Sequence, residues 1–268
     1  MTLLLFLSMP LVLGSIYSFL IFMLYPFIIA KRIKGEETMA SWIIHLRVAQ
    51  GIYQKQNLQK IAEFVMGNIA PDSGIPTADG TGFVPDAAVS HFRTVDENGI
   101  KNVHEELFIE QYFTKEKRES YNEKEYAFYL GYLVHLLTDK LWASKIVYEA
   151  KEKFPDLFEQ DNTAFWKKIK SDWYDLDFLY LKKNPEFEAF WIYEGIKEFR
   201  NSYLDFFAED AFIQRKKFII EFYREGVEKV KERETYISPD ELDAFVEYAV
   251  EKIIDEVKEE INDGKFIK

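Results

Sequence analysis

The chain has 268 residues, of which 48% are hydrophobic and 17% aromatic, with only 12 glycines and 8 prolines. That composition excludes a disordered chain and does not favour a many-stranded sandwich, which needs more turn residues. A formal net charge of −12 argues against nucleic-acid binding, and the absence of cysteine excludes disulfides and thiolate chemistry. Any metal ion must therefore be held by histidine and carboxylate side chains.

The first 38 residues differ from the rest of the chain. Residues 2–30 carry no charged side chain, and a span of that length predicts a transmembrane helix. Basic residues follow it, between Lys31 and Lys34, so the positive-inside rule places the C-terminal body in the cytoplasm. Alternatively, translation starts at Met39, because Gly35-Glu36-Glu37 can be encoded by a purine-rich ribosome-binding site. The protein is then cytoplasmic, and membrane contact is expected only if the N-terminal segment is real.

The body, residues 39–268, shows apolar periodicity near 3.6 almost throughout, which predicts a single all-α domain of several helices. Residues 70–102 break this pattern with repeated Pro, Gly and Asp, so we expect a long loop there, and such loops are usually functional. Asn122 followed by Glu125 predicts a capping box, and Ser238 before proline predicts the start of the last helix. The predicted helices span residues 42–54, 58–68, 122–153, 162–183, 186–207, 210–232 and 238–262.

The third of these helices contains the most informative of the four histidines. It is apolar around its whole circumference from Tyr126 to Leu137, so we expect it to be central and buried. His135 and Asp139 lie one turn apart on the same stripe. An ionised aspartate in the core is costly without compensation. Two explanations stay open: a metal ion bound by both side chains, or a buried His–Asp hydrogen bond assisted by Lys140 or Arg47.

Three further residues are candidate ligands. His45 shares a helical face with apolar side chains, Asp72 lies at the start of the irregular loop, and His91 lies between apolar neighbours in that loop. Each also suits a structural role, as a core histidine, a capping aspartate or a loop histidine. Together with His135 and Asp139 they form a set of imidazoles and carboxylates that suits Zn²⁺ or another divalent transition metal.

Four blocks of the sequence, in this order, resemble the zinc-dependent phospholipase C family, an all-helical hydrolase fold related to the S1/P1-type nucleases. The blocks are Trp42-x2-His45-x2-Val48-Ala49, Gly67-Asn68-Ile69-Ala70-Pro71-Asp72, His91, and Phe128-Tyr129-Leu130-Gly131-Tyr132-Leu133-x-His135-x3-Asp139. The resemblance implies that Asp72, His91, His135 and Asp139 bind one metal ion. It also implies that His45, with Asp139 as a bridge, supports a second ion.

The resemblance further implies a metal-dependent phosphoric-ester hydrolase, with Asp72 orienting or deprotonating the attacking water. Phosphoester or phospholipid molecules are the expected substrates. The chain departs from the family because no histidine follows His135 and Trp42 is internal with either start site. We therefore expect one or two zinc ions instead of a trinuclear centre.

Acidic residues downstream offer substitutes for the missing ligands. Asp172, Asp175 and Asp177 are the candidates, although a solvated acidic face over aromatic core residues is the preferred interpretation of this patch. The remaining histidine, His104, precedes two glutamates and is expected at the surface.

Two other functions stay open. One is a nucleotide phosphohydrolase of the His-Asp type, although His135 and Asp139 are not adjacent in the chain as in that class. The other is a non-catalytic helical domain that retains a degenerate metal site.

Overall fold

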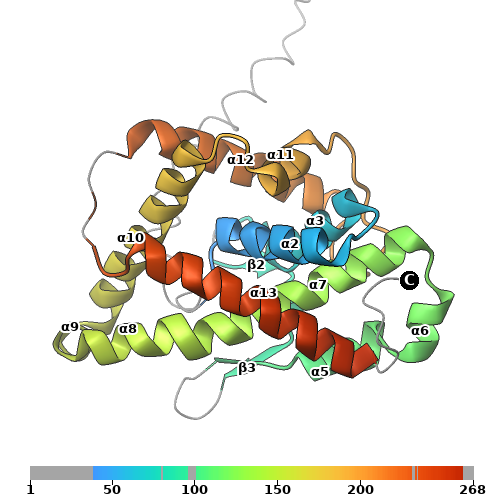
Figure 1. Ribbon diagram of the computed structural model, residues 1–268, viewed down its shortest axis with the longest axis horizontal. Coiled ribbons are helices and arrows are strands. Elements are labelled where there is room, and N and C mark those ends of the chain that lie inside the picture. Colours follow the sequence, from blue (N-terminus) through green and yellow to red (C-terminus); the bar gives the residue numbers. More distant parts are fainter. Residues whose placement is uncertain (1–38, 80, 96–100, 231–232, 234, 262–268) are drawn as a thin grey trace, which may run out of the picture. The chain divides into compact units, whose positions relative to one another are not determined.

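The structure is a computed structural model that describes residues 39–79, 81–95, 101–230, 233 and 235–261 (Figure 1). These residues belong to one compact unit. No helix among them is long and apolar enough to cross a membrane. The predicted transmembrane helix and the alternative leader sequence both fall within residues 1–38, outside the described residues.

The described chain is mainly helical, which confirms the predicted all-α class. The helical elements are α2 (Trp42–Gln56), α3 (Ile61–Ile69), the 3₁₀ turn η1 (Ala70–Asp72), α4 (Ala87–Ser90), α5 (Glu105–Tyr112), α6 (Lys115–Ser120), α7 (Glu123–Trp142), the π-helical segment η2 (Ala143–Val147), α8 (Tyr148–Lys153), α9 (Pro155–Gln160), α10 (Asn162–Lys183), α11 (Glu188–Gly195), α12 (Ala211–Lys229) and α13 (Pro239–Ile261). The strands form two antiparallel pairs, β1 (Ile75–Pro76) with β2 (Phe83–Val84) and β3 (Arg93–Val95) with β4 (Lys101–Val103).

Helices α3 and α7 pack closely because two glycines leave no side chain between them. A Cβ at Gly67 would lie 2.0 Å from the carbonyl oxygen of Phe128, and one at Gly131 would lie 2.1 Å from that of Phe64. Helix α7 is buried around its whole circumference, as predicted. Helix α2 contacts both α3 and α7, and α13 packs against α2 and α7 (Figure 1). The centre of the domain therefore consists of the helices that carry most of the candidate ligands.

The predicted helix starts are confirmed by their caps. The Asn122 side chain accepts hydrogen bonds from the first turn of α7, while the Glu125 carboxylate accepts one from the Asn122 N–H at 2.9 Å. Ser238 and Glu241 form the same reciprocal pair at the start of α13. Satisfying these free N–H groups fixes where each helix begins.

The predicted helix over 186–207 is wrong in its second half. Helix α11 ends at Gly195, and residues 196–210 are irregular. The Asn201 side chain explains this, because its Oδ1 accepts hydrogen bonds from the N–H groups of Tyr203 and Leu204, while its Nδ2 donates to two backbone carbonyls. Such local bonds offer the backbone an alternative to the helix.

The predicted loop over 70–102 contains more structure than expected. Both strand pairs begin in it, and it also holds η1 and the short helix α4. Helices α5, α6 and α9 were not predicted, since each is short and has little apolar periodicity of its own. The loop matters for function because it carries two of the five candidate ligands.

Candidate metal centre

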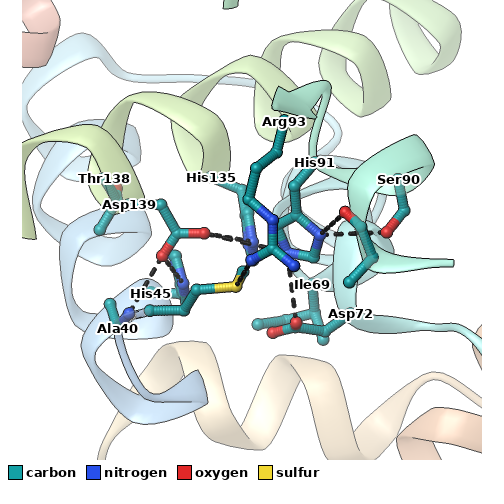
Figure 2. A network of polar contacts seen from close by, with 12 residues as sticks. Ala40, His45, Ile69, Asp72, Ser90, His91, Arg93, His135, Thr138 and Asp139 are labelled. Carbon is teal, nitrogen blue, oxygen red and sulfur yellow. Dashed lines mark hydrogen bonds and ion pairs between the residues drawn. The ribbon is translucent and has the colours of Figure 1, made fainter. Parts of the chain in front are cut away.

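All five residues predicted as ligands converge in one place (Figure 2). His45 comes from α2, Asp72 from the end of η1, and His91 from the residue that caps α4. His135 and Asp139 both come from α7. Four segments that are distant in the sequence therefore contribute side chains to a single cluster.

Asp139 lies at the centre of this cluster. Its Oδ1 is 3.2 Å from Nε2 of His45, and its Oδ2 is 3.3 Å from Nε2 of His135 and 3.8 Å from Nε2 of His91. On the other side of His91, the same Nε2 is 3.4 Å from Oδ1 of Asp72. The rings of His45 and His135 are stacked with their centroids 3.7 Å apart. The five side chains therefore form one continuous set of close polar contacts.

Backbone carbonyls determine which nitrogen of two histidines faces the cluster. The Nδ1–H of His135 donates to the carbonyl of Asn68 at 2.7 Å, and the Nδ1–H of His91 donates to that of Ala87 at 3.1 Å. In a neutral imidazole the other nitrogen then carries a lone pair. Both Nε2 atoms are thereby prepared to bind a cation, as in metal sites whose histidines are held by carbonyl acceptors.

Several polar atoms of the cluster are buried without a hydrogen-bond partner. They are both ring nitrogens of His45, Nε2 of His91, Nε2 of His135 and Oδ2 of Asp139. Buried polar groups in folded proteins are almost always satisfied, so a concentration of unsatisfied polar atoms requires an explanation. A cation between them satisfies the imidazole Nε2 atoms and the carboxylate oxygen together.

In the alternative explanation, a His135–Asp139 hydrogen bond is assisted by Lys140 or Arg47; the His135–Asp139 contact is present at 3.3 Å, but the expected assistance is wrong. Lys140 forms ion pairs with Glu105 and Glu256, and Arg47 forms one with Asp243 at 2.5 Å. Among the described residues, the ion-pair partners of Asp139 are all histidines, and its only other donor is the Ala40 N–H at 3.0 Å.

The electrostatics of the cluster favour ionised carboxylates. Burial opposes ionisation of Asp139, but His45 and His135 outweigh it and hold the pKa of Asp139 well below its usual range. Asp72 behaves likewise: burial is outweighed by His91 and the other imidazoles, so its pKa is also lowered. The two stacked imidazoles are shifted in opposite directions: burial and the neighbouring His135 lower the pKa of His45, whereas in His135 the effect of burial is outweighed by Asp139, which raises the pKa.

Two overlapping groups within the cluster could hold a metal ion. In each of them the potential ligand atoms all lie within 4.8 Å of one another. The first group is His45, His135 and Asp139, and the second is Asp72, His91 and His135. The shared residue is His135, whereas the family resemblance implies that Asp139 is the bridge.

The cluster is closed except on the side of Asp72. The side chains of the other four residues are at most 2% exposed, but that of Asp72 is 18% exposed. Asp72 is therefore the residue of the cluster that is most accessible to solvent.

The downstream aspartates do not join the cluster, and the solvated-face interpretation is wrong for two of them. Asp172 is buried and accepts hydrogen bonds from Arg233 Nε and from the N–H groups before α13. Asp177 is buried between the hydroxyls of Ser41 and Tyr223. Asp175 is half-buried. Each buried carboxylate has a structural role in the contacts of α10.

His104 lies outside the cluster, as predicted. It is half-buried, and its ring contacts Thr94 Oγ1 at 2.7 Å and Glu106 at 2.8 Å.

Sequence reasoning missed the groups that surround the ligands. The Asn68 carbonyl lies within one of the recognised blocks, but only the packing of α3 on α7 shows that it orients His135. Arg93 follows His91 by two residues and donates to the sulfur of Met39 at 3.1 Å (Figure 2). In the sequence, only its position two residues after the candidate ligand His91 could have pointed to Arg93.

The chain was compared with family models, curated proteins and solved structures, and none of them matches it.

Proposed function

We propose that this protein is a metal-dependent phosphoric-ester hydrolase whose fold and site are of the zinc-dependent phospholipase C type. The observation that carries the proposal is the convergence of five imidazole and carboxylate side chains, in which the Nε2 atoms of all three histidines and Oδ2 of Asp139 are buried without a hydrogen-bond partner. A purely structural His–Asp network would leave fewer of these atoms unsatisfied.

The donor set favours zinc. It contains three imidazoles and two carboxylates, without thiolates, and backbone carbonyls hold the tautomers of His91 and His135. One ion would be held by His45, His135 and Asp139, and a second by Asp72 and His91 with His135 or Asp139. A divalent ion supplies a Lewis acid that lowers the pKa of water and polarises a phosphoryl oxygen.

The protein residues then have distinct roles. Asp72 is the ligand nearest to solvent, and its lowered pKa keeps it ionised at neutral pH. We assign it the orientation of the attacking water and acceptance of its proton. His91 positions Asp72 through the contact between its Nε2 and Oδ1. The buried His45 and His135 exclude bulk water from the inner side of the site.

Zinc analysis and an ester panel test this proposal. Protein purified without chelator should contain one or two zinc ions by mass spectrometry. It should hydrolyse bis-p-nitrophenyl phosphate, phosphatidylcholine or a nucleotide, and the panel decides between a lipid and a nucleotide substrate. Asp72→Asn should lower kcat at least about a hundredfold, as expected for a general base. It should retain the ion at His45, His135 and Asp139.

The matched control is His104→Gln, which alters a histidine outside the cluster and should change neither zinc content nor rate. Zinc without hydrolysis of any ester would favour the non-catalytic domain, and protein without bound metal would contradict the proposal.

A further inference from the structure

Two arginines near the cluster lack a carboxylate partner, although acidic residues outnumber basic ones in this chain. Arg93 and Arg215 form no ion pair among the described residues, and the Nε atom of each is buried without a hydrogen-bond partner. Other partly buried arginines are paired, such as Arg47 with Asp243 and Arg233 with Asp172. An unpaired guanidinium in a partly buried position is costly, so its retention points to a ligand of opposite charge.

Arg93 lies beside the cluster (Figure 2). Arg93 is the first residue of β3 and lies two residues after His91. The residue between them, Phe92, has a left-handed backbone conformation with φ 48°. The Arg93 guanidinium reaches Met39, whose neighbour Ala40 donates its N–H to Asp139. Figure 2 shows the Arg93 side chain in the same view as His91 and His135. The hydrogen-bond acceptor of Arg93 at Met39 is a thioether sulfur, which is weak and leaves most donors of the guanidinium available.

Arg215 occupies a second position beside the start of α2. Its guanidinium lies 5.0 Å from the ring centroid of Trp42 and 5.4 Å from that of Phe83, which belongs to the hairpin that follows Asp72. Stacking on aromatic rings holds an arginine in place while its in-plane donors stay available.

Tyr193 lies on α11, which packs against α2 and against α12, the helix that carries Arg215. Its hydroxyl is fully buried without a hydrogen-bond partner. Burial raises the pKa of Tyr193, the charge of Arg215 lowers it, and the charge of Asp72 raises it further. The hydroxyl is therefore a neutral donor without a partner.

We infer that Arg93, together with Arg215 and Tyr193, forms an oxyanion-binding subsite at the metal centre, and that the substrate is a phosphate monoester. A monoester presents a dianionic terminal phosphoryl group whose oxygens can engage the metal and the guanidinium at once. A phosphodiester has one charge fewer, and the quaternary ammonium of phosphatidylcholine is repelled by these arginines. The inference rests on the proposed hydrolase for turnover, but the binding of phosphate can be measured without it.

The first test measures binding of inorganic phosphate to the zinc-loaded protein by calorimetry. Arg93→Gln should raise the Kd for phosphate at least about tenfold, because it removes a charge-assisted contact. Arg93→Lys keeps the positive charge but loses the planar guanidinium with its paired N–H donors, so the loss of phosphate affinity should be smaller. Arg215→Gln should weaken binding as well. The control is Arg200→Gln, which alters an arginine that is 77% exposed and pairs with Glu209, and it should leave the Kd unchanged.

The second test compares p-nitrophenyl phosphate with bis-p-nitrophenyl phosphate and phosphatidylcholine. The wild-type protein should favour the monoester, and Arg93→Gln should lower kcat/KM for the monoester more than for the diester. Zinc content and melting temperature of each variant show whether folding and the metal ligands are intact.

The two proposals fail separately. Phosphate binding that depends on Arg93, without hydrolysis of any ester, would contradict the hydrolase and support the subsite. Hydrolysis that favours the diester or phosphatidylcholine, with a phosphate Kd unaffected by Arg93→Gln, would overturn the subsite and leave the hydrolase standing.

Discussion

Two buried aspartates of this domain, Asp139 and Asp172, have opposite surroundings. Each is 2% exposed. Asp172 on α10 accepts hydrogen bonds from Arg233 Nε at 2.6 Å and from the N–H groups of Tyr236 and Ile237. Asp139 on α7 has one backbone donor and otherwise faces imidazole nitrogens. The difference teaches that burial of a carboxylate does not identify a functional site. The neighbours of the carboxylate are more informative: the donors around Asp172 satisfy its charge, whereas the unsatisfied imidazole nitrogens around Asp139 leave room for a shared cation.

Removal of a ligand from the Asp139 cluster should have the largest effect. His135→Ala should lose zinc, and with it the stability that a bound ion confers, about 4 kcal/mol when zinc exceeds its Kd a thousandfold. EDTA should lower the melting temperature of the wild-type protein by about 10 °C and leave that of His135→Ala unchanged. Calorimetry with and without EDTA measures this. Zinc content equal to that of the wild type would refute the ligand assignment.

Asp172 should matter for stability alone. Asp172→Ala removes the ion-pair partner of Arg233, whose side chain is 13% exposed. It also removes the acceptor of the hydrogen bonds from the N–H groups of Tyr236 and Ile237. We expect a loss of about 3 kcal/mol in the free energy of unfolding, as for other broken buried ion pairs. Zinc content should equal that of the wild type. Denaturant titration and zinc analysis of the same sample check both parts, and a loss of zinc would end the distinction between the two aspartates.

Asp177 should make stability depend on pH. Burial raises the pKa of Asp177 from 3.8 to about 7, although Ser41 and Tyr223 donate hydrogen bonds to its carboxylate. Between these values the folded protein keeps a proton that the unfolded chain has lost, so stability falls as pH rises from about 4 to about 7.

The matched variant for this prediction is Asp177→Asn, which cannot titrate. The free energy of unfolding of the wild type relative to the variant should decrease by about 1 kcal/mol per pH unit across this range. Urea titrations at three pH values measure the slope. A difference that does not change with pH would show that the buried carboxyl keeps an ordinary pKa.

The smallest effect is expected at a helix cap far from the cluster. Ser238→Ala removes the side-chain acceptor for the Glu241 N–H at the start of α13 and should cost about 1 kcal/mol. Zinc content should not change. Ser202→Ala, at an exposed position outside any helix, is the control and should change stability by less than about 0.5 kcal/mol.

The helices of this domain were largely predictable because their determinants are local. The caps at Asn122 and Ser238, and the all-round apolar surface of α7, appear directly in the sequence and recur in the structure. The error in the predicted helix after Gly195 has a physical cause as well. The hydrogen bonds of Asn201 compete with the helix, and apolar periodicity does not register such competition.

The site was predictable in its residue types but not in its arrangement. The small number of potential metal ligands was the useful signal, because four histidines and no cysteine leave few possible ligand sets. The unpaired arginines could not be predicted, because an arginine looks the same in sequence whether or not a carboxylate reaches it.

The amino-acid sequence by itself determined where most helices begin, which helix is buried, and which side chains are available to bind a cation. These properties depend on residues within a few positions of one another. The tertiary structure alone decided that Asn68 orients His135, that Lys140 and Arg47 turn away from Asp139, and that His135 belongs to both ligand groups. These facts depend on how α2, α3 and α7 pack. The packing in turn depends on close approach at two glycines, across separations in the chain that no local pattern spans.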